Sequence, residues 1–182
     1  VAATGAACGV QAPFKRPENL SDNYATTLAV TRHALDWYEE NHGEIGVIIT
    51  VYPTAVFLEP HHLQEALEQI SPGKVETVFP VIEFPYPIQR GLFLEEDCTA
   101  RMINTEHHST RSQDLRTAYH DAGQFYVQTP DAVRSNIPLL SNKASVITLS
   151  RLEAVDIDTP EDFEVAEQLF KMRRDHPPKS SK

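Results

Sequence analysis

Hydrophobic positions in the first half of the chain follow the spacing of helices and of buried strands. Leu28 and Leu35 lie near helical spacing and Gly43 can end the helix, which predicts a helix over about residues 24–42. The run IGVIITVY at 45–52 is β-branched without polar alternation, as is typical of a strand covered on both faces. The same reasoning predicts two further elements in this half: a helix over 60–70 and a strand over 75–83.

The second half continues the alternation of strands and helices. Apolar runs on both sides of Glu-Glu-Asp predict a hairpin at 90–103. Strands alternating with helices predict an α/β fold: a doubly wound, mostly parallel sheet with the hairpin as an insertion at about 84–122. We expect one domain over residues 1–174 and a disordered tail over 175–182. The other expected elements are a short helix over 113–123, strands over 124–128 and 144–150, a helical turn over 130–136 and a closing helix over about 160–174.

Two aspartates stand one residue apart just before the closing helix. In an extended EAVDID segment, Asp156 and Asp158 point to one face while Val155 and Ile157 point to the core. Thr159 can cap the following helix, so the helix start needs neither aspartate. Adjacent carboxylates repel unless a cation lies between them, and Mg²⁺ resolves that conflict. The alternative is that one aspartate assists the turn while the other faces solvent.

A dense polar stretch at 104–127 offers a second set of candidate residues. Arg111 can grip a carboxylate through its planar fork, and Gln113 and Asp114 can bind hydroxyls and amides. The alternative places Arg111 in a surface salt bridge, with Asp114 capping a short helix. Histidines also occur here and suggest zinc, but suitable acidic ligands are not evident and surface histidines are the preferred interpretation; they are His107, His108 and His120.

The loop at 81–93 combines aromatic residues, two prolines and an amide. Phe84 and Tyr86 each precede a proline and are therefore pushed toward extended conformations, which makes the loop stiff. With Gln89 beside the aromatic rings, the loop either forms one wall of a sugar site or is a structural crossover with core aromatics.

Net charge, cysteine content and hydropathy disfavour a nucleic-acid partner, a disulfide framework and a membrane-spanning segment. The chain has 26 acidic and 16 basic residues, a formal charge of -10, which disfavours a nucleic-acid partner. Cys8 and Cys98 are too few and too far apart for a disulfide framework or zinc site, which fits a reducing cytoplasm. No apolar run approaches the roughly 20 residues that span a bilayer, so we expect no membrane association.

Five stretches, in order, resemble the acylneuraminate cytidylyltransferase family, and within it the pseudaminic acid branch. They are RPENLSDN, YPTAVFLEP, FPYPIQR, TRSQDLRTAYHDAGQFY and VDIDTPEDFEVAE, which together cover about residues 10–170. The resemblance implies a Mg²⁺-dependent enzyme that joins CMP from CTP to a nine-carbon keto-sugar acid and releases pyrophosphate. It further implies a nucleotide-diphospho-sugar transferase-like fold and a homodimer in which the inserted hairpin region reaches the partner's site.

The resemblance also assigns roles to residues. Asp156 and Asp158 would bind magnesium, and Arg111 would hold the sugar, with Gln113 and Asp114 beside it. Arg16 would lie on the nucleotide side, with Thr27 a weaker candidate nearby.

Two departures from the family pattern stand out. Tyr52 replaces the glutamine that precedes Pro-Thr in the sialic acid branch, which fits a different sugar acid. No two of the seven glycines frame a basic residue in a phosphate-cradling loop, so that part of the family pattern is absent. We therefore interpret the chain as N-terminally truncated, without the first strand-loop-helix unit, and expect weak CTP binding and little activity. Two alternatives stay open: a sialic-acid-type enzyme for another keto-sugar acid, and a non-catalytic fragment that dimerises and binds the sugar.

Overall fold

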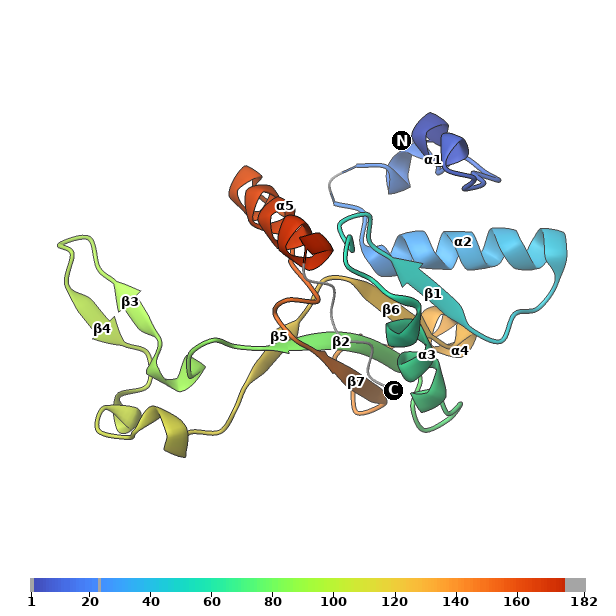
Figure 1. The fold of residues 1–182 in the computed structure, drawn as a ribbon. Coiled ribbons are helices and arrows are strands. Elements are labelled where there is room, and N and C mark those ends of the chain that lie inside the picture. The colour runs from blue at the N-terminus through green and yellow to red at the C-terminus, as the bar shows by residue number, and fades with distance from the viewer. Residues whose placement is uncertain (1, 23, 176–182) are drawn as a thin grey trace.

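A computed structural model describes residues 2–22 and 24–175 of the chain (Figure 1). The helices are α1 (Ala2–Ala7), α2 (Thr27–His42), α3 (Pro60–Gln69), α4 (Pro130–Arg134) and α5 (Pro160–Asp175). The strands are β1 (Ile48–Val51), β2 (Thr77–Glu83), β3 (Leu92–Leu94), β4 (Ala100–Met102), β5 (Tyr119–Asp121), β6 (Phe125–Gln128) and β7 (Ala144–Leu149). Single 3-10 turns are η1 (Glu18–Leu20), η2 (Ile88–Arg90), η3 (Thr105–His107) and η4 (Ser112–Asp114).

The main sheet is open and mixed, which confirms the α/β class but corrects the expected pairing. β1, β2 and β7 run in one direction, and β2 pairs with β7 in parallel. β6 runs the opposite way between β1 and β2, and β5 continues along the same edge of β2. Three of the four pairings are therefore antiparallel. Hydrophobic runs alone predict buried strands without their direction, so the sequence pattern missed this reversal.

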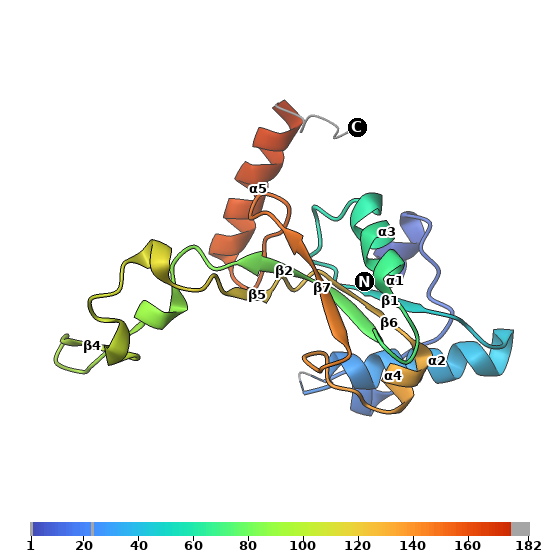
Figure 2. The same ribbon diagram turned by 90° about the horizontal axis from the view of Figure 1, so that it is seen from below.

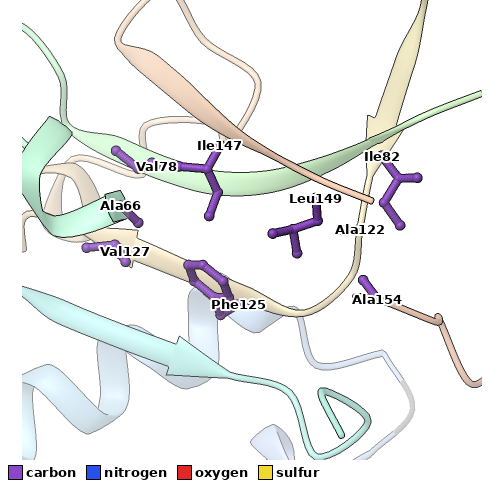
Figure 3. Packing of buried hydrophobic residues seen from close by; sticks show 9 residues of the cluster. All are labelled: Ala66, Val78, Ile82, Ala122, Phe125, Val127, Ile147, Leu149 and Ala154. Carbon is purple, nitrogen blue, oxygen red and sulfur yellow. The ribbon is translucent and has the colours of Figure 1, made fainter. Parts of the chain in front are cut away.

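Helices cover both faces of this sheet. α3 packs on one face, and α2 with α4 lies on the other (Figure 2). β2 shows why both layers form: Val78 and Ile82 point toward the α3 side, whereas Phe79 and Val81 point to the opposite side. The core on the α3 side is shown in Figure 3 and consists of Ala66, Val78, Ile82, Ala122, Phe125, Val127, Ile147, Leu149 and Ala154.

Residues 84–118, which we call the arm, leave the sheet after β2 and return at β5. The arm holds the predicted hairpin, in which β3 pairs with β4 in antiparallel register, and it projects away from the sheet in both views (Figures 1 and 2). β5 pairs with β2, so the segment outside the sheet ends at Ala118 and not near residue 122.

One predicted helix was wrong, and the start of the expected tail moves by one residue. The helix expected over 113–123 is a single 3-10 turn, η4, followed by strand β5. Its polar, aromatic sequence has weak helical preference, and pairing with β2 outweighs it. Asp175 belongs to α5, and the remainder of the expected tail, 176–182, lies outside the described residues.

Thr159 and Asp162 form a reciprocal cap at the start of α5, as the sequence predicts for Thr159. The Asp162 amide donates to Thr159 Oγ1 at 3.2 Å, and the Thr159 amide donates to Asp162 Oδ2 at 2.8 Å. The Thr159 hydroxyl also donates to Asp162 Oδ2 at 2.8 Å, and this bond, followed by the one from the Thr159 amide, lowers the pKa of Asp162 below its ordinary value.

A lowered carboxyl pKa makes the stability of α5 depend on acid. At pH values above the pKa of the unfolded aspartate, about 4, the cap contributes its full stability. This contribution is lost as the pH falls from there through the lower pKa of Asp162 in the folded protein. Helix content followed by circular dichroism from pH 6 to pH 2 should show this loss. In Asp162→Asn the acid-dependent part of the change should shrink, whereas Asp131→Asn, an exposed aspartate on α4, should leave it unaltered. An unchanged acid transition in Asp162→Asn would contradict the role of this cap.

Candidate active site at the carboxyl edge of the sheet

The carboxyl ends of β1, β2 and β7 lie at the same edge of the sheet, which we call the carboxyl edge. The register aligns them, because Ile48 and Thr77 both lie opposite Gln128, and Thr77 also lies opposite Ala144. Since β6 is reversed, its first residues also lie at this edge, and the Tyr52 amide donates to the Gln124 carbonyl at 2.9 Å. In open α/β sheets, ligands bind at this edge.

Two tyrosines bring polar groups together here. The Tyr52 hydroxyl lies 2.6 Å from the Thr27 hydroxyl, so the structure joins two residues that the sequence had proposed separately. The buried Tyr126 ring packs edge-on against Tyr52, with centroids 5.5 Å apart. Tyr126 donates its hydroxyl to Asp121 Oδ2 at 2.7 Å. Burial, and then this hydrogen bond, raise the Tyr126 pKa, so the phenol stays protonated and holds the Asp121 carboxylate in place.

The paired aspartates follow the alternation predicted for them. Asp156 and Asp158 are exposed, whereas Val155 and Ile157 pack against the cluster that joins Phe57 to α5. Gln124, buried at the start of β6, donates from Nε2 to the Val155 carbonyl at 3.2 Å and so ties this segment to the carboxyl edge.

The Asp156 carboxylate lies directly against the backbone at Gly123. A Cβ added at Gly123 would lie 3.0 Å from Asp156 Oδ1, so a larger residue there would force the carboxylate to move. Although Asp156 is largely exposed, partial desolvation of its carboxylate raises its pKa, and the negative charges of Asp158 and Asp121 raise it further. The site therefore gathers oxygen donors whose mutual repulsion favours a bound cation.

Comparing Gly123→Ala with Gly73→Ala separates the effect of the Asp156 contact from the effect of backbone strain. Gly123 has φ +61 and Gly73 has φ +85, but nothing lies within 4 Å of a Cβ added at Gly73. Both alanine variants should lose roughly 1 kcal/mol of stability to the left-handed backbone, measured by urea unfolding. Only Gly123→Ala should also shift the carboxyl carbon resonance of Asp156 in NMR spectra. Equal spectra in the two variants would contradict the close packing of Asp156.

The candidate sugar-binding residues Arg111, Gln113 and Asp114 lie on the arm. No described contact joins them to Asp156 or Asp158. Arg111 forms an exposed ion pair with Asp114, with Nε to Oδ2 at 2.8 Å and Nη2 to Oδ1 at 3.2 Å. This ion pair is the surface salt bridge that the sequence left open, although Asp114 ends η4 and caps no helix. None of the hydrogen bonds described for residues 2–22 and 24–175 joins Arg111 to the carboxyl edge.

The stiff loop and the polar stretch meet at the base of the arm. Gln113 lines a cleft of about 320 Å³ there, together with Phe84 and Tyr86 of the loop. Gln89 donates from Nε2 to the Arg116 carbonyl at 2.9 Å, which ties the two segments together. Arg16 is exposed, and in the described part of the chain no hydrogen bond or ion pair is recorded for it.

Asp121 and Tyr126 were not predicted as site residues, although both lie in the motif TRSQDLRTAYHDAGQFY. The available signal was Asp121 two residues before Gly123, because such an aspartate often accepts the amide of a turn. Asp121 does so here, from the Gly123 amide at 2.9 Å. Asp121 also lines a cavity of about 430 Å³ with Phe79 and Val81 on the sheet face opposite α3.

Known proteins resemble this chain over most of its length. It is 36% identical over 167 residues to a pseudaminic acid cytidylyltransferase of Campylobacter jejuni, a match that covers 92% of this chain and 72% of that protein. The chain belongs to the acylneuraminate cytidylyltransferase family. The resemblance inferred from the five motifs is thereby confirmed.

Further relatives show the breadth of the acylneuraminate cytidylyltransferase family. A Helicobacter pylori protein described as pseudaminic acid cytidylyltransferase and UDP-2,4-diacetamido-2,4,6-trideoxy-beta-L-altropyranose hydrolase is 33% identical over 143 residues, which are 78% of this chain and 27% of that protein. The N-acylneuraminate cytidylyltransferase A of Danio rerio is 26% identical over 155 residues, which are 85% of this chain and 35% of that protein. No protein-family model matches the chain. Within the described residues, no helix is long and apolar enough to cross a membrane.

Proposed function

We propose that this protein transfers CMP from CTP to pseudaminic acid and releases pyrophosphate. The observation that carries the proposal is the 36% identity to a pseudaminic acid cytidylyltransferase over 92% of the chain. The carboxyl edge supports it independently, because paired carboxylates and a tyrosine network lie where α/β enzymes bind ligands.

In this reaction the anomeric hydroxyl of the sugar acid attacks the α-phosphorus of CTP. A new oxygen–phosphorus bond forms as the bond to the leaving pyrophosphate breaks, and the hydroxyl proton passes to water or to an adjacent phosphate. Such transfers depend on positioning and charge neutralisation more than on covalent catalysis. Tyr126 would keep Asp121 oriented, while Arg16 and Thr27 would lie on the nucleotide side.

Asp156 and Asp158 fit a magnesium site by their chemistry. Their carboxylates are hard oxygen donors, and desolvation, followed by like-charge repulsion, already raises the Asp156 pKa. They would hold Mg²⁺, which when bound supplies charge neutralisation for phosphate oxygens. Because the raised pKa delays ionisation of Asp156, affinity for the ion should rise with pH through the range where Asp156 deprotonates.

We infer that sugar binding is completed by a second copy of the chain. Arg111 and Gln113 lie on the arm, and no described contact joins them to Asp156 of the same chain. The arm ends in an exposed apolar strand, in which Leu94 is 77% exposed. A homodimer in which each arm reaches the partner's carboxyl edge buries that strand and brings the two sets of residues together.

Leu94→Asp should weaken this homodimer at least tenfold, because a buried charge replaces an apolar contact. Light scattering coupled to size exclusion, over a dilution series, measures the dissociation. The matched control is Leu152→Asp, since Leu152 is also an exposed leucine, at 56%, but lies outside the arm. Monomers of the parent chain at every concentration, or equal effects of the two variants, would rule out this interface.

A pyrophosphate-release assay with CTP and Mg²⁺ tests the proposed function. Pseudaminic acid, N-acetylneuraminic acid and buffer alone are supplied in parallel, and CMP-sugar is detected by mass spectrometry. We expect CMP-pseudaminic acid at a low rate, because no glycine pair in the sequence frames a phosphate-binding basic residue. Product from N-acetylneuraminic acid alone would redirect the assignment to the sialic acid branch.

Binding measurements separate weak catalysis from the wrong function. Calorimetry with the sugar acid and Mg²⁺, and separately with CTP, should detect both ligands even where turnover is slow. Tyr52→Gln and Gln89→Ala then report on sugar choice, since both positions are candidates for sugar contact. Binding of sugar without any binding of CTP or formation of product would favour the alternative of a non-catalytic sugar-binding protein.

A further inference from the structure

His61, His62 and Glu153 form a compact cluster away from the residues of the proposed reaction. One nitrogen of each histidine and one Glu153 carboxylate oxygen lie within 4.8 Å of one another. His61 and His62 belong to the first turn of α3, and Glu153 lies in the turn that follows β7. Within the part of the chain that the structure describes, it is the one group of three such ligand residues that meets this distance.

His62 is the unusual member, because its ring is buried without full hydrogen bonding. The residue is 2% exposed, and its Nδ1 accepts the Glu59 amide at 3.2 Å as part of the helix cap. Nε2 is buried and has no hydrogen-bond partner, and its closest acidic atom, Glu153 Oε1, is 3.8 Å away. A buried polar atom without a partner is unfavourable, so this nitrogen is a candidate for binding a ligand.

The protonation states around His62 suit a metal ion. Burial, and then the neighbouring His61, lower the His62 pKa, which favours the neutral ring that coordinates metals. The Ser150 amide donates to Glu153 Oε2 at 2.8 Å and fixes that carboxylate, while Oε1 faces His62. The positive end of α3 works against any cation, so the acidic neighbours have to supply the attraction.

Acidic side chains outnumber basic ones around the cluster. Glu59 and Glu153 carry two negative charges, and the Arg173 guanidinium, which pairs with Glu59, carries one positive charge. With neutral histidines, one negative charge remains to attract a cation. Glu59 Oε2 also lies 3.5 Å from His61 Nδ1, close to the position of the outer carboxylate that orients many metal-binding histidines.

We propose that His61, His62 and Glu153 bind a zinc-class divalent metal ion that fastens α3 to the segment leading to Asp156. Two imidazoles and one carboxylate are a ligand set that such ions accept, and water can occupy the fourth position. When His62 Nε2 binds the metal, the ring proton moves to Nδ1. The Glu59 amide then loses Nδ1 as its hydrogen-bond acceptor, whereas Nε2 gains the metal as a partner. The site is structural and separate from the carboxylate-only pair that suits Mg²⁺.

Cobalt(II), which reports four-coordinate imidazole sites by visible absorption, tests the proposal on the whole chain. The expected result is saturable binding of one Co²⁺ per chain, displaced by Zn²⁺ and not by excess Mg²⁺. His61→Ala and Glu153→Gln should each weaken binding by roughly 100-fold or more, at least the upper end of the loss caused by removing an outer partner of a metal ligand. Both side chains are partly exposed, at 58% and 36%, so these variants should fold. The matched control His108→Ala, an exposed histidine on the arm, should bind as the parent chain does.

A thermal measurement adds a second readout. Zn²⁺ at about 100 times its Kd should raise the Tm of the parent chain by roughly 5–10 °C, and the same Zn²⁺ concentration should raise the Tm of the His61→Ala variant much less. Asp156→Asn should retain both effects, which separates this site from the proposed catalytic one. Absence of Co²⁺ absorption, or absorption that persists in both His61→Ala and Glu153→Gln, would overturn the proposal.

Discussion

Asp156→Asn is expected to lower the rate of CMP transfer by on the order of 100-fold or more, the loss typical of removing one preorganised electrostatic contact at a reacting phosphate. The substitution keeps the size of the side chain and its place beside Gly123, but removes the charge that attracts a divalent ion. Asp158→Asn should act in the same direction. Pyrophosphate release measured against Mg²⁺ concentration checks this, because excess metal should restore part of the lost rate.

The same variant has an opposite expected effect on stability, which distinguishes a lost ligand from a damaged fold. Without divalent ions near pH 7, Asp156→Asn should unfold at a higher urea concentration than the parent chain, because it relieves repulsion from Asp158 and Asp121. The sign follows from linkage: a raised native pKa means that ionisation of Asp156 destabilises the native state as pH increases. Asp131→Asn, which removes an exposed ion pair with Arg134 on α4, should leave the rate unchanged and should not raise stability. Full activity in Asp156→Asn would remove the proposed magnesium site.

Phe125→Ala is expected to cost about 3–5 kcal/mol of the free energy of unfolding, a large part of the roughly 5–15 kcal/mol of a typical domain. The Phe125 ring projects from β6 into the core on the α3 side, where it is fully buried among aliphatic side chains (Figure 3). Removing it leaves a cavity that the surrounding strands cannot fill without breaking their pairing. Urea unfolding followed by circular dichroism measures the loss.

Phe163→Ala is the matched control for this prediction. Phe163 lies in α5 and is 62% exposed, so the same substitution removes little buried surface and should cost less than about 1 kcal/mol. If the two variants unfold at the same urea concentration, the core described around Phe125 does not dominate stability. Phe125 also begins β6 next to Gln124, so its loss should disturb the carboxyl edge before the domain unfolds completely.

The elements with strong hydrophobic periodicity were predictable, whereas strand direction and the β5 segment were not. The predictions for α3, β2 and α5 were confirmed because caps and continuous apolar runs define them locally. β5 depends on its pairing with β2, which is a contact between distant parts of the sequence. The reversal of β6 likewise follows from which strands become neighbours, and a hydrophobic run is the same when read in either direction.

The candidate site was predictable where local geometry fixes it. Alternation alone placed Asp156 and Asp158 outward and their neighbours inward, and the structure confirms that arrangement. The contact of Thr27 with Tyr52 and that of Tyr126 with Asp121 depend on the fold, so the sequence could name candidates without pairing them. The histidines at the start of α3 were missed because their acidic partner Glu153 lies far away in sequence.

The arm begins and ends at one point on the sheet, because Glu83 lies directly opposite Tyr119 in the β2–β5 ladder. A segment closed in this way can be lengthened, shortened or exchanged without shifting the strands that carry it. With the roles proposed above, the arm residues Arg111 and Gln113 can therefore change without altering the strands that position Asp121 and Asp156.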